Sequence, residues 1–383
     1  MRTLFKNARL IGRNGESESR FLTVENGKIM SFREENADET VDLKGNWVVP
    51  GFVDIHVHGG GGFDLCDATP EAVIGMCATH VQHGTTTIFP TLVSCSREMI
   101  RAVCDVFRKT KAQLPCHAVG LHLEGPFLSP AMCGAQRPDL IVLPTEEDAE
   151  LVEENRDVIS RITCAPEVEH VMPFAERLMS SGVSFSMGHT NATYEQAEAA
   201  YEAGFSSITH LYSATSGFHK VDGRVHIGVT QYAYAEKGIF AELIGDGCHV
   251  PKELMRLVVS VKGANRVCLV TDAMRVAGTT VTESYLGAVE PKNRVIVEDG
   301  VAKLPDRSCF AGSIGTMDRA FRFAVQRAGL SMSEAARLTS LTPATLMGLG
   351  DQKGSIEVGR DADLAVLDSE LNVCDVYVSG KKL

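Results

Sequence analysis

Eight short apolar segments recur between residues 48 and 273, and they constrain the fold of this chain more than any other feature. Each has the length of a strand, and segments with helical spacing lie between them, for example 69–84, 96–110 and 191–204. Strands that alternate with helices over roughly 250 residues predict the α/β class and a (β/α)8 barrel, whose active site lies at the carboxyl ends of the strands. The eight segments are 48–58, 85–93, 117–125, 162–167, 183–189, 206–212, 239–247 and 266–273.

Both ends of the chain also have the sequence pattern of short strands. Residues 1–47 contain short apolar runs, with Asn26-Gly27 as a hairpin signal, and residues 350–383 return to the same pattern. We expect the two ends to form one small β domain beside a barrel made by residues 48–349. A hairpin insertion in the barrel is expected near 294–311.

The overall charge and the cysteines limit the classes of partner. Asp and Glu (49) outnumber Lys and Arg (37), so the formal net charge is −12. Nucleic acids and anionic membranes require a basic surface, so neither is an expected partner. The 11 cysteines are scattered without CxxC pairs, and no run approaches the roughly 20 apolar residues of a membrane span. We expect reduced thiols and a cytoplasmic, unanchored protein.

Two histidines end the first expected strand. His56 and His58 are two residues apart, so their imidazoles point to the same face of a strand. The glycines at 59–62 let the backbone turn and approach a ligand closely. Two imidazoles are only half of a first metal shell, and a surface pair before a flexible loop is equally compatible with this segment.

Other candidate metal ligands fall at the ends of later strands. Glu124 ends the third expected strand, His189 closes the fifth and His210 lies near the end of the sixth. Together with the first pair they form a set of imidazole and carboxylate ligands that suits zinc, iron, manganese or cobalt. We expect one or two divalent ions per chain. A buried network of hydrogen-bonded histidines is the alternative, but it leaves the clustering at strand ends unexplained.

Two further residues are placed to act on a substrate. Asp272 ends the eighth expected strand, where a carboxylate could take a proton from an activated water and return one to a leaving group. His249 follows the seventh strand and could polarise a carbonyl or stabilise an oxyanion.

Motifs along nearly the whole chain occur in the order PGFVDIHVHGGGG, HGTTTIFPT, GLHLEGPF, APE, GHTNATYEQA, THLY, DGCHV, LVTDAM, FAGS and GSIEVGRDADLAVLD. In this order they resemble the amidohydrolase superfamily and, within it, the N-acetylglucosamine-6-phosphate deacetylase family. The resemblance implies Glu124, His189 and His210 as the principal metal ligands, His249 as the residue that contacts the carbonyl, and Asp272 as the acid and base. The retained pair of histidines on the first strand implies that a second metal can bind, and the resemblance also suggests a homodimer.

The resemblance implies hydrolysis of the acetamide of an N-acetylamino sugar. The expected substrate is N-acetylglucosamine 6-phosphate, which would yield glucosamine 6-phosphate and acetate in amino-sugar catabolism. The expected contacts with this amino-sugar phosphate are Ala135, Gln136, Ser213, Ala214, Arg224, Asp246, Gly247, Phe310, Ala311 and Gly312.

The segment after the sixth strand departs from the family pattern. Family members commonly follow Thr-His-Leu with an aromatic residue and Asn-Ala-Met; here Tyr212 is followed by Ser213, Ala214 and Thr215, and the loop after them lacks the usual Arg-x-Pro-Gly. Arg224 is the expected replacement cation for a phosphate dianion, with Lys220 nearby. Gln136 also stands where some members have histidine.

Two other functions are compatible with the fold. The first is another amidohydrolase that acts on a related N-acyl sugar or on a cyclic amide. Cyclic-amide hydrolases commonly bridge two metals with a carboxylated lysine, and no lysine occurs in the eight expected strands. The second is a catalytically dead barrel used as a scaffold, which would be expected to have lost ligands that this chain retains.

Overall fold

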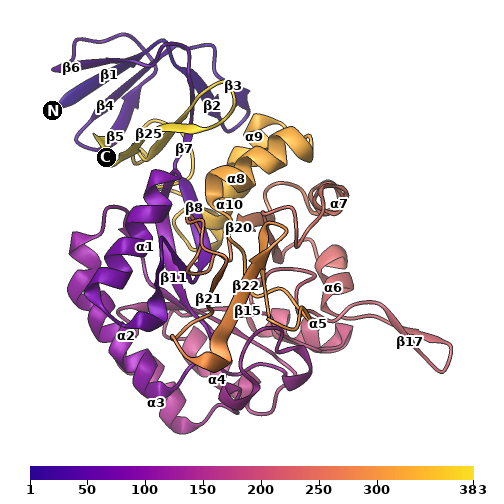
Figure 1. Cartoon of the computed structure of the whole chain (residues 1–383). Coiled ribbons are helices and arrows are strands. Elements are labelled where there is room, and N and C mark those ends of the chain that lie inside the picture. The colour runs from indigo at the N-terminus through magenta and orange to yellow at the C-terminus, as the bar shows by residue number, and fades with distance from the viewer.

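The computed structural model describes residues 1–383, and its central body is a barrel of parallel strands surrounded by helices (Figure 1). The strand order around the barrel is β8-β11-β13-β14-β15-β16-β19-β20, and each neighbouring pair is parallel. Backbone hydrogen bonds from His58 to Ala273 (2.8 Å) and from Asp272 to His56 (2.9 Å) join the last strand to the first. The expected (β/α)8 fold class is confirmed.

Each of the eight expected segments overlaps one strand of the barrel. The apolar runs form strands because their side chains are buried on both faces of the sheet. A two-residue strand, β12 (His117–Ala118), precedes the third. The barrel strands are β8 (Phe52–Val57), β11 (Thr85–Leu92), β13 (Leu121–Glu124), β14 (Ile159–Cys164), β15 (Ser184–Met187), β16 (Ser207–Ile208), β19 (Phe240–Ile244) and β20 (Val267–Val270).

Side-chain caps fix where several helices begin. Thr69 accepts a hydrogen bond from the Ala72 amide at the start of α1, and Thr193 forms a capping box with Gln196 at the start of α5. Gly204 ends α5 in the left-handed conformation. The helices are α1 (Pro70–Gln82), α2 (Arg97–Thr110), α3 (Glu146–Glu154), α4 (Val171–Met179), α5 (Tyr194–Ala203), α6 (Val229–Ala235), α7 (Lys252–Lys262), α8 (Met317–Arg322), α9 (Met332–Ala336) and α10 (Thr342–Leu346). None of them combines the length and the apolar character needed to cross a membrane.

Strands from both chain ends share one six-stranded sheet, in the order β26-β25-β24-β7-β2-β3. A second sheet of four strands, β5-β4-β1-β6, packs with it around a separate core that includes Phe5, Leu22, Val48 and Tyr377. These are the sheets above the barrel in Figure 1, and they confirm the expected contribution of both ends. The bounds are β1 (Arg2–Lys6), β2 (Arg9–Gly12), β3 (Gly15–Glu16), β4 (Phe21–Glu25), β5 (Lys28–Ser31), β6 (Glu39–Asp42), β7 (Trp47–Pro50), β24 (Leu364–Leu367), β25 (Val373–Val378) and β26 (Lys381–Lys382). The division of the chain at residues 47 and 350 stays a prediction.

The expected hairpin at Asn26-Gly27 is confirmed, because β4 and β5 are antiparallel with Glu25 opposite Lys28. Both turn residues have positive φ angles, 50° and 79°, as a tight two-residue turn requires. A three-stranded antiparallel insertion, β21 (Glu283–Tyr285), β22 (Arg294–Glu298) and β23 (Val301–Lys303), follows the last barrel strand. The segments 283–286 and 309–312, at its two ends, supply residues to the cavity described below.

Candidate active site

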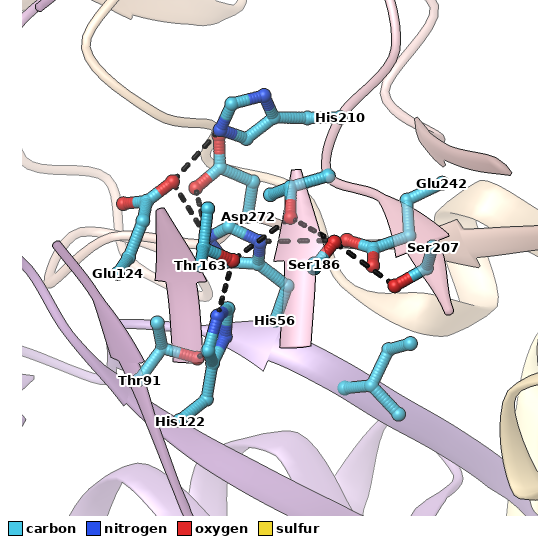
Figure 2. A network of polar contacts seen from close by, with 12 residues as sticks. His56, Thr91, His122, Glu124, Thr163, Ser186, Ser207, His210, Glu242 and Asp272 are labelled. Carbon is cyan, nitrogen blue, oxygen red and sulfur yellow. Dashed lines mark hydrogen bonds and ion pairs between the residues drawn. The ribbon is translucent and has the colours of Figure 1, made fainter. Parts of the chain in front are cut away.

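The carboxylate of Glu124 lies at the centre of four histidine side chains at the carboxyl ends of the barrel strands. Its Oε1 atom is 2.7 Å from Nε2 of His210 and 3.2 Å from Nε2 of both His56 and His189. Its Oε2 atom is 3.4 Å from Nε2 of His58. Figure 2 shows Glu124, His56, His210 and Asp272 with their polar atoms converging on one point. The Nε2 atoms of four histidines therefore surround the carboxylate of Glu124.

Asp272 closes the other side of this cluster. Its Oδ1 atom is 3.1 Å from Nε2 of His58 and 3.6 Å from Nε2 of His56, and these two Nε2 atoms are 3.2 Å apart. Two groups of ligand atoms, each within 4.8 Å of one another, can be drawn in the cluster: His56, His58 and Asp272, and His56, Glu124 and His210. The two groups share His56, so this residue could serve either position.

Three of the histidines are oriented by backbone carbonyls. Nδ1 of His58 lies 3.1 Å from the Thr91 carbonyl, Nδ1 of His189 lies 2.8 Å from the Met132 carbonyl, and Nδ1 of His210 lies 3.0 Å from the Ser213 carbonyl. A carbonyl only accepts, so each Nδ1 carries the proton and each Nε2 presents a lone pair to the cluster. Imidazole lone pairs and carboxylates converging in a buried site fit a divalent cation.

The candidate site residues at the later strand ends have unusual backbone conformations. His189, His210 and Asp272 have φ angles of 47°, 30° and 49°, in the left-handed region that non-glycine residues seldom occupy. Such a conformation costs about 1 to 3 kcal/mol and persists only where the surroundings hold it. Here hydrogen bonds hold it, for example from the Ser129 amide to the His189 carbonyl (2.9 Å). The cost of this strain is consistent with a functional constraint on these three side chains.

The site concentrates negative charge in a buried place. Burial disfavours the charged form of His56, but the carboxylates of Glu124, Glu242 and Asp272 outweigh it and raise the pKa of His56 to about 9. Burial would also raise the pKa of the Glu124 carboxyl, but the neighbouring His56 and His189 hold it well below its usual range. The carboxylates thus require positive charge, which a bound cation can supply in place of protons.

His249 is held by the aspartate that begins its own loop. Its Nδ1 donates to Oδ2 of Asp246 at 2.7 Å, and Oδ1 of Asp246 accepts from the amides of Cys248 and His249, both at 2.9 Å. Burial lowers the pKa of His249 and the hydrogen bond to Asp246 raises it, with a net upward shift. The His249 ring packs edge-on against Phe310, with ring centroids 4.9 Å apart. His249 therefore presents Nε2 to the cavity in a fixed orientation.

A cavity of about 200 Å³ lies over the cluster of candidate metal ligands, which consists of Glu124, the four histidines and Asp272, and it brings most of the expected residues together. The expected ligands and catalytic residues in its wall are His58, Glu124, His189, His210, His249 and Asp272, while His56 lies beneath them. The expected substrate contacts in its wall are Ala135, Gln136, Ser213, Ala214, Phe310 and Gly312. Val93 and Leu286 also line it and were not expected from the sequence.

Four of the expected substrate contacts lie outside this cavity wall. Asp246 stands behind His249, as described above. Gly247 lies close to the Phe323 ring, which a Cβ atom at this position would meet at 2.5 Å, and Ala311 is fully buried among apolar residues such as Met274 and Val295. Asp246, Gly247 and Ala311 therefore support the residues of the cavity wall and do not line the cavity themselves.

Arg224 lies on an exposed hairpin that projects away from the barrel, which Figure 1 shows at β17. The hairpin consists of β17 (His219–Val221) and β18 (Arg224–His226), and every residue of both strands is exposed. The structure therefore does not bring Arg224 into the cavity of its own chain. The sequence could not show this, because the direction of a projecting hairpin depends on its tertiary surroundings.

A model of the amidohydrolase family matches residues 47–383. The chain belongs to the amidohydrolase family. A Haemophilus influenzae protein named N-acetylglucosamine-6-phosphate deacetylase is 32% identical over 368 residues, which cover 94% of each chain. The crystal structure of N-acetylglucosamine-6-phosphate deacetylase from Pasteurella multocida matches with a TM-score of 0.91 at 31% identity and covers 100% of both chains. These similarities confirm the resemblance carried by the sequence motifs.

One similar structure contains a sugar phosphate. It is a mutant of N-acetyl-D-glucosamine-6-phosphate deacetylase from Mycobacterium smegmatis in complex with N-acetyl-D-glucosamine-6-phosphate. It matches this chain with a TM-score of 0.88 at 31% identity and covers 100% of this chain and 99% of that one.

Proposed function

We propose that this protein is a metal-dependent deacetylase that hydrolyses N-acetylglucosamine 6-phosphate to glucosamine 6-phosphate and acetate. The observation that carries the proposal is that Asp272, His249 and the ligands around Glu124 line one cavity at the carboxyl ends of the barrel strands. The names of similar proteins support the choice of substrate.

Glu124, His189 and His210 are proposed to hold a principal divalent ion, with His56 and His58 available for a second. The donor set is compatible with zinc, iron, manganese or cobalt. Such an ion supplies Lewis acidity, which acidifies water and polarises a carbonyl oxygen.

Asp272 is proposed to move the protons of the reaction. Its carboxylate takes one proton from the attacking water and delivers it to the amide nitrogen as the C–N bond breaks. The water oxygen remains on the acyl carbon, so the products are acetate and a free amine. Asp272 is suited to this task because the nearby His56 and His58 lower its pKa against the effect of burial, which keeps the carboxylate ionised at neutral pH.

His249 is proposed to hold the carbonyl oxygen of the substrate. Because Nδ1 is engaged by Asp246, Nε2 is the atom that can donate to this oxygen. The Asp246 carboxylate also stabilises the positive charge of a protonated imidazole, so the donor is strengthened when negative charge develops on the oxygen.

We propose that the protein forms a homodimer through the β17–β18 hairpin. The hairpin and the residue before it carry exposed apolar side chains, namely Val221 (49% exposed), Val225 (57%) and Phe218 (59%). An isolated two-stranded hairpin is marginally stable in water, and an exposed apolar patch commonly marks an interaction surface. Arg224 lies outside the cavity of its own chain, so its proposed contact with a bound phosphate would be made in the cavity of a second copy.

A deacetylation assay tests the proposal directly. Purified protein of known metal content is incubated with N-acetylglucosamine 6-phosphate or N-acetylglucosamine, and acetate and free amine are measured. We expect equal release of the two products from the phosphorylated sugar and a higher kcat/KM than for the unphosphorylated one. No release of acetate from either sugar by metal-loaded protein would contradict the proposed activity.

A further inference from the structure

His56 differs from the other three histidines of the site in what its Nδ1 atom faces. The others direct Nδ1 at backbone carbonyls, whereas Nδ1 of His56 faces Oε2 of Glu242 at a distance of 3.6 Å. Figure 2 shows His56 between the carboxylates of Glu124 and Glu242, one beside each ring nitrogen. Glu242 lies in β19, on the inside of the barrel and beneath the metal-ligand cluster.

Neither of these two facing atoms has another partner. Both side chains are fully buried, and Nδ1 of His56 and Oε2 of Glu242 make no hydrogen bond. The present separation is longer than a hydrogen bond. Leaving a buried donor or acceptor unpaired costs about 1 to 3 kcal/mol, so a small approach that joins the two is favourable.

A buried arginine holds Glu242 in place. Arg161, in β14, is fully buried and contacts Oε1 of Glu242 through Nη2, which leaves Oε2 for His56. Nη2 also lies 3.2 Å from Oγ of Ser207, and Nη1 donates to the Ile55 carbonyl at 3.2 Å. Ile55 precedes His56 in β8. The Arg161 guanidinium therefore contacts both the strand that carries His56 and the Glu242 carboxylate that faces His56.

We propose that Glu242 is a positioning residue. Its carboxylate accepts a hydrogen bond from the Nδ1–H group of His56 and so directs the Nε2 lone pair at the metal site. Arg161 balances the Glu242 charge and fixes its geometry. Glu242 performs for His56 the task that the carbonyls of Thr91, Met132 and Ser213 perform for the other histidines. The inference rests on the proposed metal site and adds two residues, Arg161 and Glu242, that the proposed reaction does not use.

The inference predicts a selective effect on metal binding. Loss of the Glu242 carboxylate weakens the ion held by His56 and His58 and leaves the ion held by Glu124, His189 and His210 in place. Outer partners of metal-bound histidines typically change metal affinity by roughly 10- to 100-fold. A residue that only supported the fold would weaken both ions together.

Zn²⁺ titrations against a chromogenic chelator, with a double-mutant cycle, test this prediction. We expect Glu242→Gln to weaken the second Zn²⁺ by at least roughly 10-fold in the wild-type background and to have no effect in a His56→Ala background. Ser186→Ala is the matched control, because Ser186 is buried in the same part of the barrel and hydrogen-bonds to Thr209 and Ser207 rather than to His56 or Glu242. It should leave both affinities unchanged.

Glu242→Gln leaves the Arg161 charge without its carboxylate and could therefore misfold. A second variant separates an effect on metal binding from an effect on folding. The double substitution Arg161→Met with Glu242→Met removes both charges and fills the space, an exchange that buried ion pairs often tolerate. It should fold and show the same selective loss. Two Zn²⁺ ions bound with wild-type affinities in both variants would overturn the inference and leave the proposed function standing, whereas a wild-type protein that binds no Zn²⁺ would contradict both.

Discussion

Gln136 donates a hydrogen bond of 2.6 Å from Nε2 to Oε2 of Glu124. The orientation of its amide is fixed, because Oε1 of Gln136 accepts from the Ser94 amide at 2.8 Å. Oε2 of Glu124 is therefore engaged by the protein, while the Nε2 atoms of His56, His189 and His210 surround Oε1. This arrangement favours Oε1 as the oxygen that Glu124 offers to the proposed principal ion, and it gives Gln136 a function in orienting Glu124.

Replacement of Gln136 by alanine should release Glu124 from this orientation. We expect metal affinity or kcat to fall by roughly 10- to 100-fold, the usual effect of losing an outer partner of a metal ligand. Metal content and initial rates measured on the same preparations check the prediction. Gln136→His is the informative comparison, because an imidazole can still donate to Oε2, and it should retain more of both properties than alanine.

Replacement of His210 by alanine should abolish tight metal binding. His210 makes the shortest contact with Glu124, at 2.7 Å, and belongs to the ligand set proposed for the principal ion. We expect bound metal to drop below one ion per chain after dialysis, with activity lost in proportion. His170→Ala serves as control, because His170 is an exposed residue outside the site. Full metal content in the His210 variant would place the principal site elsewhere.

The strand positions and the clustering of the candidate metal ligands could be predicted because they depend on local pattern. Glu124, His189 and Asp272 each follow an apolar run, and in a barrel the carboxyl ends of all strands meet at one face. The fold class was therefore enough to predict that these residues, which are far apart in the sequence, lie close together in the structure.

The remaining features depend on contacts that no local pattern encodes. Leu286 reaches the cavity because the insertion folds back over the barrel, and Arg224 misses it because its hairpin projects outward. Glu242 did carry a signal, since it is a charged residue inside the expected strand 239–247, whereas Arg161 lies just before the expected strand 162–167. Their pairing, however, depends on the interior packing of β14 and β19, which are not neighbours in the barrel.

Replacement of Asp272 by asparagine should lower kcat while the protein stays folded. An amide cannot take the proton of the water or return one to the amine, and loss of a general acid and base typically costs about 10² to 10⁴ in rate. We expect the ion held by Glu124, His189 and His210 to remain. Steady-state rates and metal content on one preparation check this, and a rate within a fewfold of wild type would assign the proton transfers to another group.

Replacement of Asp363 by asparagine should destabilise the junction between the end sheets and the barrel. Asp363 is buried and lies 2.6 Å from Nζ of Lys353 and 3.3 Å from Nε2 of His117, in the barrel. Removing one partner of a buried ion pair lowers the free energy of unfolding by about 3 kcal/mol. Chemical denaturation at pH 7 measures it, with the exposed Asp351→Asn as control.

The same carboxylate should contribute to acid sensitivity. Burial raises the pKa of Asp363, but the contacts with His117 and Lys353 outweigh it, so its pKa in the folded state lies below the ordinary 3.8. A depressed pKa means that its stabilising contribution is complete above pH 3.8 and is lost as the pH falls through the lower, folded-state value. The stability of Asp363→Asn should therefore decline less than that of the wild type in this acidic range.

Replacement of Arg224 by alanine should raise KM for N-acetylglucosamine 6-phosphate and barely affect the unphosphorylated sugar, because a guanidinium can grip a phosphate through two parallel hydrogen bonds. Arg224→Lys should recover part of the loss, since it keeps the charge. Equal losses on both sugars would instead assign Arg224 a role in folding the hairpin.

Mixed dimers decide which chain supplies the arginine. Arg224→Ala chains keep Asp272, and Asp272→Asn chains keep Arg224, so refolding the two together places both intact residues in one cavity only if Arg224 acts across the dimer. We expect the mixture to regain the low KM for the phosphorylated sugar, with a kcat below that of wild type because only a fraction of the sites is complete. If mixing restores nothing although size-exclusion chromatography confirms exchange of subunits, Arg224 does not reach the second cavity, and the proposed dimer contact is wrong.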